Sequence, residues 1–181
     1  AIHTQTRRGS DMKFTLQSIK GVILIEPTNH DDDRGYFVET FRQDLLEEAI
    51  GYKINFVQDN ESRSLKGVLR GLHYQLPPYT QAKLLRVIEG NVLDVAVDIR
   101  KSSPTFGQHV SLELTAQNKY QLFVPHGFAH GFIVLSNSAT FAYKVDNYYA
   151  PEHDRGIAFD DKELKIDWQS SAEELQLSDK D

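Results

Sequence analysis

Short apolar segments separated by turn residues run through most of the chain, and this pattern constrains the fold more than any other feature. Segments this short, rich in branched and aromatic side chains, predict β-strands rather than long helices. The predicted strands cover residues 21–26, 36–41, 56–61, 67–74, 83–89, 91–100, 110–114, 120–124, 131–135 and 140–147. So many short strands favour a mainly β fold, an antiparallel two-sheet sandwich of jelly-roll type with a few short helices.

The predicted strand over residues 91–100 shows a regular alternation. Leu93, Val95 and Val97 point to one face, because successive side chains of a strand alternate between the two faces of the sheet. Asp94 and Asp98 lie on the other face. These two carboxylates are therefore either solvated or line a polar cavity.

Turn signals separate the strands. Gly90 and Asn91 join two strands at the spacing of a β-hairpin, and residues 136–138 separate another two. One helix is predicted over residues 44–50, with Asp44 capping its start and apolar residues at helical spacing. A weaker signal predicts a helical turn over residues 171–175.

The length of 181 residues fits a single domain, which we assign to residues 12–181. Residues 1–11 are polar and precede Met12, the only methionine. We interpret them as a leader added ahead of the natural chain, because they lack the apolar centre of a signal peptide.

Composition excludes several classes of function. The chain has no cysteine, which rules out disulfides, thiolate metal sites and a cysteine nucleophile. A formal net charge of −6 argues against nucleic-acid binding through a broad basic surface. No segment approaches the roughly 18 apolar residues needed to cross a membrane. The cytoplasm is the simplest compartment for such a chain.

His73 and three other residues are candidates for roles in chemistry or binding. Arg70 and Lys83 offer cations suited to phosphates or to a developing oxyanion, and Tyr143 offers a weak acid. In a regular strand Arg70 and His73 point to opposite faces, but Gly71 permits a bulge that would bring both into one pocket. The alternative is a structural histidine beside a solvated strand edge.

A metal site is not predicted. The segment Pro125-x-Gly127-x-x-His130 resembles the second motif of metal-binding cupins. The first motif of metal-binding cupins is absent, because His73 is followed by Tyr74 and Gln75 instead of a second histidine. We therefore expect neither a metal nor another cofactor.

Taken together, the motifs closely resemble the dTDP-4-dehydrorhamnose 3,5-epimerase family, whose members have the cupin fold. The resemblance covers nearly the whole chain after Met12. It is carried by Asp33-Arg34-Gly35-Tyr36-Phe37, Phe56-Val57-Gln58-Asp59-Asn60, residues 67–75, residues 94–100, Ser103-Pro104-Thr105-Phe106-Gly107 and residues 127–132, and continues to Trp168.

The resemblance implies an epimerase that removes the C3 and C5 protons of dTDP-4-keto-6-deoxy-D-glucose and returns them on the opposite faces. The product is dTDP-4-keto-L-rhamnose, on the route to dTDP-L-rhamnose. By resemblance, His73 is the general base, Tyr143 the acid, and Lys83 the group that stabilises charge on the C4 oxygen. Asp181 matches the carboxylate that pairs with the base, and Asp94 is the alternative.

Binding residues are likewise implied by the resemblance. Matching positions for the nucleotide and sugar are Arg34, Glu39, Gln58, Asn60, Arg70, His130 and Tyr149. The family's N-terminal strands cross to a second subunit, which implies a homodimer in which Arg34 and Gln58 help to complete the partner's site. His30 replaces a phenylalanine common in the family, and this change is expected to affect contact with the base.

Two other functions stay open. A narrower enzyme would epimerise only C3 or only C5 with the same base and acid. A catalytically inactive binding module would keep the sugar-nucleotide pocket, although the joint presence of His73, Lys83 and Tyr143 argues against it. A metal-dependent cupin oxygenase is a distant third.

Overall fold

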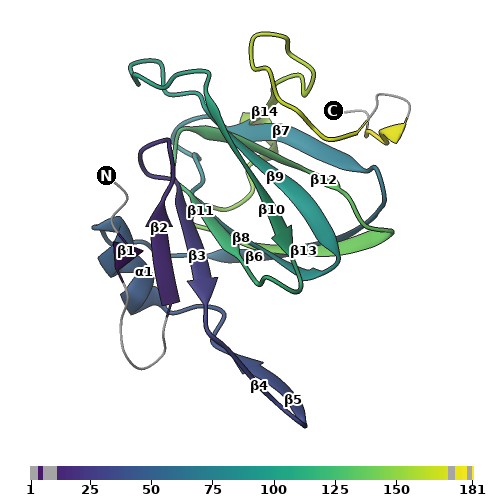
Figure 1. Cartoon of the computed structure of the whole chain (residues 1–181). Helices are drawn as coiled ribbons and strands as arrows, with labels where there is room; N and C mark the ends of the chain where they lie inside the picture. The colour runs from purple at the N-terminus through teal and green to yellow at the C-terminus, as the bar shows by residue number, and fades with distance from the viewer. Residues whose placement is uncertain (1–3, 6–11, 171–173, 179–180) are drawn as a thin grey trace.

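Two antiparallel sheets face each other and form a sandwich (Figure 1). The computed structural model describes residues 4–5, 12–170, 174–178 and 181. One sheet has seven strands in the order β1-β2-β3-β11-β8-β13-β6, and the other has five in the order β10-β9-β12-β7-β14. The predicted antiparallel β sandwich is confirmed.

The strands of the seven-stranded sheet are β1 (Thr4–Gln5), β2 (Met12–Leu16), β3 (Ile23–Pro27), β11 (Gln121–Val124), β8 (Lys83–Glu89), β13 (Ser138–Val145) and β6 (Gln58–Leu65). Those of the five-stranded sheet are β10 (His109–Thr115), β9 (Asn91–Asp98), β12 (Phe128–Val134), β7 (Leu69–Gln75) and β14 (Asp154–Gly156). A separate pair consists of β4 (Asn29–Asp32) and β5 (Gly35–Val38). The helices are α1 (Gln43–Ile50) and the short 3₁₀ helix Pro151–His153.

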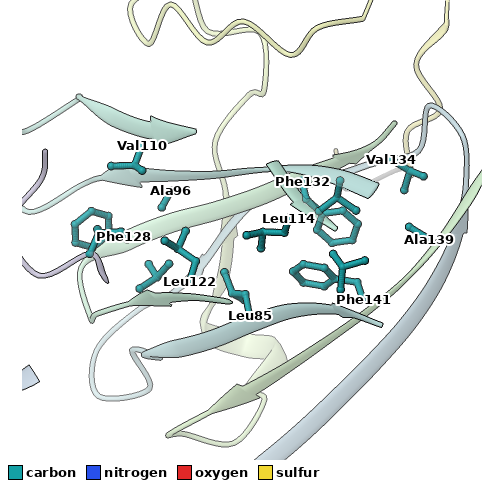
Figure 2. Packing of buried hydrophobic residues seen from close by; sticks show 14 of the residues in the cluster. Leu85, Ala96, Val110, Leu114, Leu122, Phe128, Phe132, Val134, Ala139 and Phe141 are labelled. Atoms are coloured by element: carbon teal, nitrogen blue, oxygen red, sulfur yellow. The ribbon is translucent and has the colours of Figure 1, made fainter. Parts of the chain in front are cut away.

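The main core fills the space between the two sheets. Figure 2 shows Leu85 and Phe141 of the seven-stranded sheet opposite Phe132 of the five-stranded sheet. The rings of Phe132 and Phe141 stack with centroids 4.2 Å apart. Such close aromatic contacts stabilise the packing beyond their buried area.

Strand β9 separates this core from a second one. Its alternating residues Leu93, Val95 and Val97 point outward, where the C-terminal segment with Trp168 covers them. Asp94 and Asp98 point inward and are fully buried, so neither is solvated. Buried carboxylates require hydrogen-bonding partners; Asp98 has partners at both oxygens, and Asp94 has one at Oδ1.

Asp98 organises the loop that follows β9. Its carboxylate accepts hydrogen bonds from Arg100 Nε at 3.0 Å and from the Ser103 and Thr105 hydroxyls, each at 2.6 Å. Burial alone would raise the pKa of the Asp98 carboxyl, but these hydrogen bonds together outweigh it and hold the pKa well below its usual range.

Asp98 is therefore expected to make the fold sensitive to acid. A carboxyl with a depressed folded-state pKa contributes stability above its unfolded pKa, near 4, and loses it as the pH falls further. We expect Asp98→Asn to lower the free energy of unfolding at pH 7 by about 2 kcal/mol. Urea unfolding between pH 7 and 2.5 should show a flatter acid dependence for this variant, and equal slopes for both proteins would contradict the assignment.

The predicted hairpin at Gly90 is wrong, whereas the turn predicted near residues 136–138 does separate two strands. β8 and β9, joined by Gly90, lie in different sheets, and so do β12 and β13, joined through residues 135–137. In both places the chain crosses from one sheet to the other. A tight turn in the sequence is compatible with a hairpin or with a crossing between sheets. It determines where the chain reverses direction, but not which strand the next residues pair with.

The predicted helix is present and starts one residue earlier, at Gln43. The prediction that Asp44 caps it is wrong, because Arg42 occupies the N-cap position and makes no side-chain cap. Asp44 lies in the first turn, where its carboxylate accepts two hydrogen bonds from the Arg42 guanidinium at 2.6 and 2.9 Å. Asp44 cannot cap the helix because it lies inside the first turn, two residues after the N-cap position.

The remaining predictions of secondary structure are partly wrong or concern residues outside the described ranges. The sequence did not indicate β2, and the strand predicted over residues 36–41 ends at Val38. Of the helical turn predicted over residues 171–175, residues 171–173 lie outside the described part, as do residues 1–3 and 6–11 of the expected leader. In the described ranges, no helix is long and apolar enough to cross a membrane.

Candidate active site

A bulge in β7 brings Arg70 and His73 to the same pocket, which is the arrangement that Gly71 was expected to permit. His73 pairs with His130 of β12 and Arg70 pairs with Phe132, so two residues of β7 face a single residue of β12 between these pairs. Gly71 has a φ of 132°, and a Cβ there would lie 2.5 Å from the Gly131 Cα. Only glycine fits this close approach of two strands.

The pocket lies between the two sheets and has a volume of about 530 Å³. It gathers nine of the eleven side chains proposed from the sequence: His73, Tyr143, Lys83, Asp181, Gln58, Asn60, Arg70, His130 and Tyr149. Six further residues that the sequence did not single out also line it: Glu61, Ser62, Gln81, Phe132, Phe141 and Ser178. Residues far apart in the chain thus form one site.

His73 is paired with Asp181. The Nε2 atom of the histidine lies 2.8 Å from Oδ1 of the aspartate, whose side chain is almost fully buried. The Asp181 carboxylate is held by the backbone N–H of Gly71 at 3.1 Å and by the Ser178 hydroxyl at 2.7 Å. The two side chains are thus in direct contact within the pocket.

Asp94, the alternative partner, contacts a different histidine. Its Oδ1 atom lies 2.6 Å from Nε2 of His130, and both side chains are buried. Each histidine of the pocket therefore has its own carboxylate. Asp94 orients His130 and leaves His73 to Asp181.

Lys83 and Tyr143 come from neighbouring strands of the seven-stranded sheet. The Lys83 ammonium lies 5.7 Å from the centre of the Tyr143 ring. Burial lowers the pKa of Lys83 to about 8, although the negative charges of Asp94 and Asp154 act in the opposite direction. Lys83 also lines a second, more apolar cavity of about 640 Å³, which shares Gln81 with the first.

Several of the polar side chains that line the pocket are connected by hydrogen bonds. Gln58 donates from Nε2 to Oδ1 of Asn60 at 2.8 Å and accepts from the backbone N–H of Tyr149 at 3.0 Å. Arg70 donates from Nε to the Ser64 hydroxyl at 2.9 Å. Gln58, which the resemblance assigned to the partner's site, lines the pocket of its own chain.

Arg34 and Glu39 do not line this pocket. Arg34 lies at the tip of the β4–β5 hairpin, which projects away from the sandwich (Figure 1). Its side chain is 90% exposed and pairs with Asp32 at 2.7 Å. His30 lies on the same projecting hairpin.

No metal centre is evident in the part of the chain that the structure describes. Within these ranges, no group of three or more His, Cys, Asp or Glu side chains is arranged to hold a metal ion. The two histidines that line the pocket are instead paired with carboxylates. Such pairs suit proton transfer, because a carboxylate orients an imidazole and stabilises its charged form.

Comparisons with known proteins agree with this site. One relative, a dTDP-4-dehydrorhamnose 3,5-epimerase of Shigella flexneri, is 56% identical over 170 residues, or 94% of this chain and 93% of the relative. The crystal structure of dTDP-6-deoxy-D-glucose-3,5-epimerase from Legionella pneumophila, in complex with dTDP-4-keto-L-rhamnose, is 51% identical with a TM-score of 0.90. It covers 93% of this chain and 89% of its own.

The name of a more distantly related solved structure describes a narrower activity. It is a 3'-monoepimerase from Streptomyces bikiniensis in complex with dTDP-quinovose, 35% identical with a TM-score of 0.84, matching 91% of this chain and 82% of its own. The family model for dTDP-4-dehydrorhamnose 3,5-epimerase matches residues 16–181. The chain therefore belongs to the dTDP-4-dehydrorhamnose 3,5-epimerase family.

Proposed function

We propose that this protein converts dTDP-4-keto-6-deoxy-D-glucose to dTDP-4-keto-L-rhamnose, a step in dTDP-L-rhamnose biosynthesis. The observation that carries the proposal is the meeting of His73 and Tyr143, from two facing sheets, in one pocket with Lys83. Family membership supports it independently. We also infer a cytoplasmic location, because a charged nucleotide sugar does not cross a bilayer unaided.

The chemistry requires two proton removals and two proton returns. The C3 and C5 protons both lie next to the C4 ketone, so removing either one gives an enolate whose charge rests on the C4 oxygen. Because the ketone already acidifies both positions, the reaction needs no redox cofactor or metal. The protein has to supply a base, an acid and a positive charge.

The pocket offers one group for each task. His73, oriented by Asp181, removes the protons, since imidazole titrates near neutral pH. Tyr143 returns a proton from the opposite face. Lys83 stabilises the enolate oxygen as an ammonium group. The remaining pocket residues bind the nucleotide and the sugar: Gln58, Asn60, Arg70, His130 and Tyr149.

NMR in heavy water tests the proposal. The substrate is incubated with the protein and deuterium is read at C3 and C5. Deuterium at both carbons with inverted configuration is the expected result. Uptake at one carbon would indicate a single-carbon epimerase, the alternative that the Streptomyces bikiniensis relative favours. No uptake despite measured binding would indicate an inactive binding module.

Lys83 is expected to limit activity at alkaline pH. Its pKa of about 8 means that the ammonium form is progressively lost above that pH. We expect kcat/KM, which reports the ionisation of the free enzyme, to fall about tenfold for each pH unit above 8. In a Lys83→Arg variant the charge persists, so this decrease should shift to higher pH. A parent profile that stays flat to pH 9.5 would contradict the role.

We propose further that the protein is a homodimer and that the β4–β5 hairpin reaches the partner subunit. The hairpin carries Tyr36 and Phe37 with their side chains largely exposed, which is unusual for aromatic residues without a partner surface. It also carries Arg34 away from the pocket of its own chain. Arg34 then contacts the diphosphate bound in the partner's pocket, where its guanidinium makes charge-assisted hydrogen bonds.

Mixing two variants of reduced activity tests this arrangement. Arg34→Ala is expected to lower activity by weakening substrate binding, and His73→Asn by removing the base. A mixed dimer contains one pocket with an intact His73 and an intact Arg34 from the other subunit, so the mixture should recover activity. Activity equal to the sum of the separate variants would mean that Arg34 acts within its own chain. Light scattering measures the dimer itself.

A further inference from the structure

A buried glutamine at the end of β7 connects the two loops that border the pocket. Gln75 is 4% exposed and lies two residues beyond His73 on the same strand. Its amide nitrogen donates to the carbonyl oxygens of Tyr79 at 2.7 Å and Tyr148 at 3.2 Å. Its amide oxygen accepts from the backbone N–H of Ala150 at 2.8 Å.

These contacts fix the orientation of the amide. A reversed amide would place its oxygen against two carbonyl oxygens and its NH₂ group against an N–H donor. All three partners are backbone atoms, so the contacts constrain the path of the two loops and not their side chains. A fully hydrogen-bonded buried amide of this kind holds its partners in one arrangement.

Tyr149 lies between two of the backbone groups that Gln75 holds. Its own N–H donates to Gln58 Oε1 at 3.0 Å, so the peptide groups of Tyr148, Tyr149 and Ala150 are all held by glutamine side chains. The Tyr149 side chain lines the pocket and is about half exposed. The backbone that these glutamines hold is the point from which the Tyr149 ring extends into the pocket.

The neighbouring loop is tied to the same segment. Asn147 donates from Nδ2 to the Thr80 carbonyl at 2.6 Å, and Gln81 donates from Nε2 to the Asn147 carbonyl at 2.9 Å. Gln81 and Lys83 come shortly after Thr80 in the sequence, and both line the pocket. Gln75 is the most buried of these three amides, and it binds backbone atoms of both loops.

We propose that Gln75 is a positioning residue that sets the Tyr149 ring for binding the nucleotide of the substrate. The inference rests on the proposed function, in which Tyr149 contacts the nucleotide. Gln75 does not touch the reacting atoms, so it acts on substrate affinity and not on the proton transfers. Its role is separate from that of Asp181, which holds the base.

The variant Gln75→Leu removes all three hydrogen bonds with little change in volume. We expect KM, and the Kd for dTDP measured by calorimetry, to rise about tenfold or more, because stacking of a base on an aromatic ring is worth about 1–3 kcal/mol. kcat should change less than about threefold. A fall in kcat with an unchanged KM would overturn the proposal.

A double-mutant cycle with Tyr149→Ala gives the sharper test. If Gln75 acts through the Tyr149 ring, then removing Gln75 costs little further dTDP affinity once the ring is gone. If the losses of dTDP affinity in the two single variants add fully in the double variant, Gln75 acts by another route. Because dTDP binding is measured directly, this result is readable even if the parent protein fails to epimerise the sugar, which would count against the proposed function alone.

Asn118 supplies a matched control. Its amide also makes three hydrogen bonds to backbone, with the N–H groups of Thr115 and Tyr120 and the carbonyl of Glu113, in a turn that does not line the pocket. Asn118→Leu should lower the melting temperature and leave the Kd for dTDP unchanged. An equal loss of dTDP affinity in both variants would mean that the Gln75 effect is general destabilisation.

A measurement on the parent protein covers the case in which Gln75→Leu does not fold. Amide hydrogen exchange should show protection of the Ala150 N–H, although residues 148 and 149 beside it are exposed. Exchange of the Ala150 amide at the rate of an open loop would overturn the proposal without any variant.

Discussion

Replacing His73 with asparagine is expected to lower turnover by about 10²–10⁴-fold, the range attributed to a general base. Asparagine keeps a polar side chain opposite Asp181 but has no group that takes up a proton near neutral pH. The loss should appear in kcat, with little change in dTDP affinity. The measurement is product formation by NMR, together with deuterium uptake from heavy water at C3 and C5.

Variants of the two carboxylates identify the partner of the base. Asp181→Asn should reduce kcat by less than His73→Asn does, because the imidazole remains but loses its fixed orientation. Asp94→Asn acts on His130 and is expected to alter substrate binding. If Asp94→Asn lowered kcat and Asp181→Asn had no effect, the pairing of His73 with Asp181 would have no role in the reaction. A His73→Asn protein as fast as the parent would refute the mechanism.

Replacing Tyr143 with phenylalanine is expected to reduce formation of the epimerised product by about 10²–10⁴-fold. The base remains in this variant, so deuterium from heavy water should still enter the substrate. It should do so with retention of configuration, because His73 returns a proton only to the face from which it removed one. NMR of the recovered sugar separates this exchange from inversion.

Phenylalanine isolates the effect of the hydroxyl. The Tyr143 ring packs 5.8 Å from the Phe141 ring and lies 5.7 Å from the Lys83 ammonium, and a phenylalanine ring keeps both contacts. Stability and dTDP affinity should therefore stay close to those of the parent. Inversion at the parent rate in Tyr143→Phe would mean that another group, or water, delivers the second proton.

The strands follow from local sequence to a large extent. The alternation in β9 predicted two faces, and the structure has a hydrophobic core on each side of that strand. Gly71 permitted a bulge, and the structure has one there, which turns Arg70 and His73 toward one pocket. Both signals are local, because side-chain alternation and the steric freedom of glycine depend on a few consecutive residues.

Other features depend on contacts that no local pattern contains. The sequence did not reveal that the chain crosses between sheets after Gly90, because strand pairing depends on packing across the whole sandwich. It did not reveal that Gln75 holds the backbone on both sides of Tyr149, more than seventy positions along the chain. A buried glutamine near a turn carries no signal for such distant partners.

The β architecture and the residue types that the site needs could be predicted from the sequence alone, because they follow from short-range periodicity and side-chain chemistry. Which of these groups meet depends on the tertiary structure. It paired His73 with Asp181 and gave Asp94 to His130. It also buried Lys83 deeply enough to lower its pKa to about 8. These properties arise when distant segments exclude water from a shared pocket, and that exclusion exists only in the folded chain.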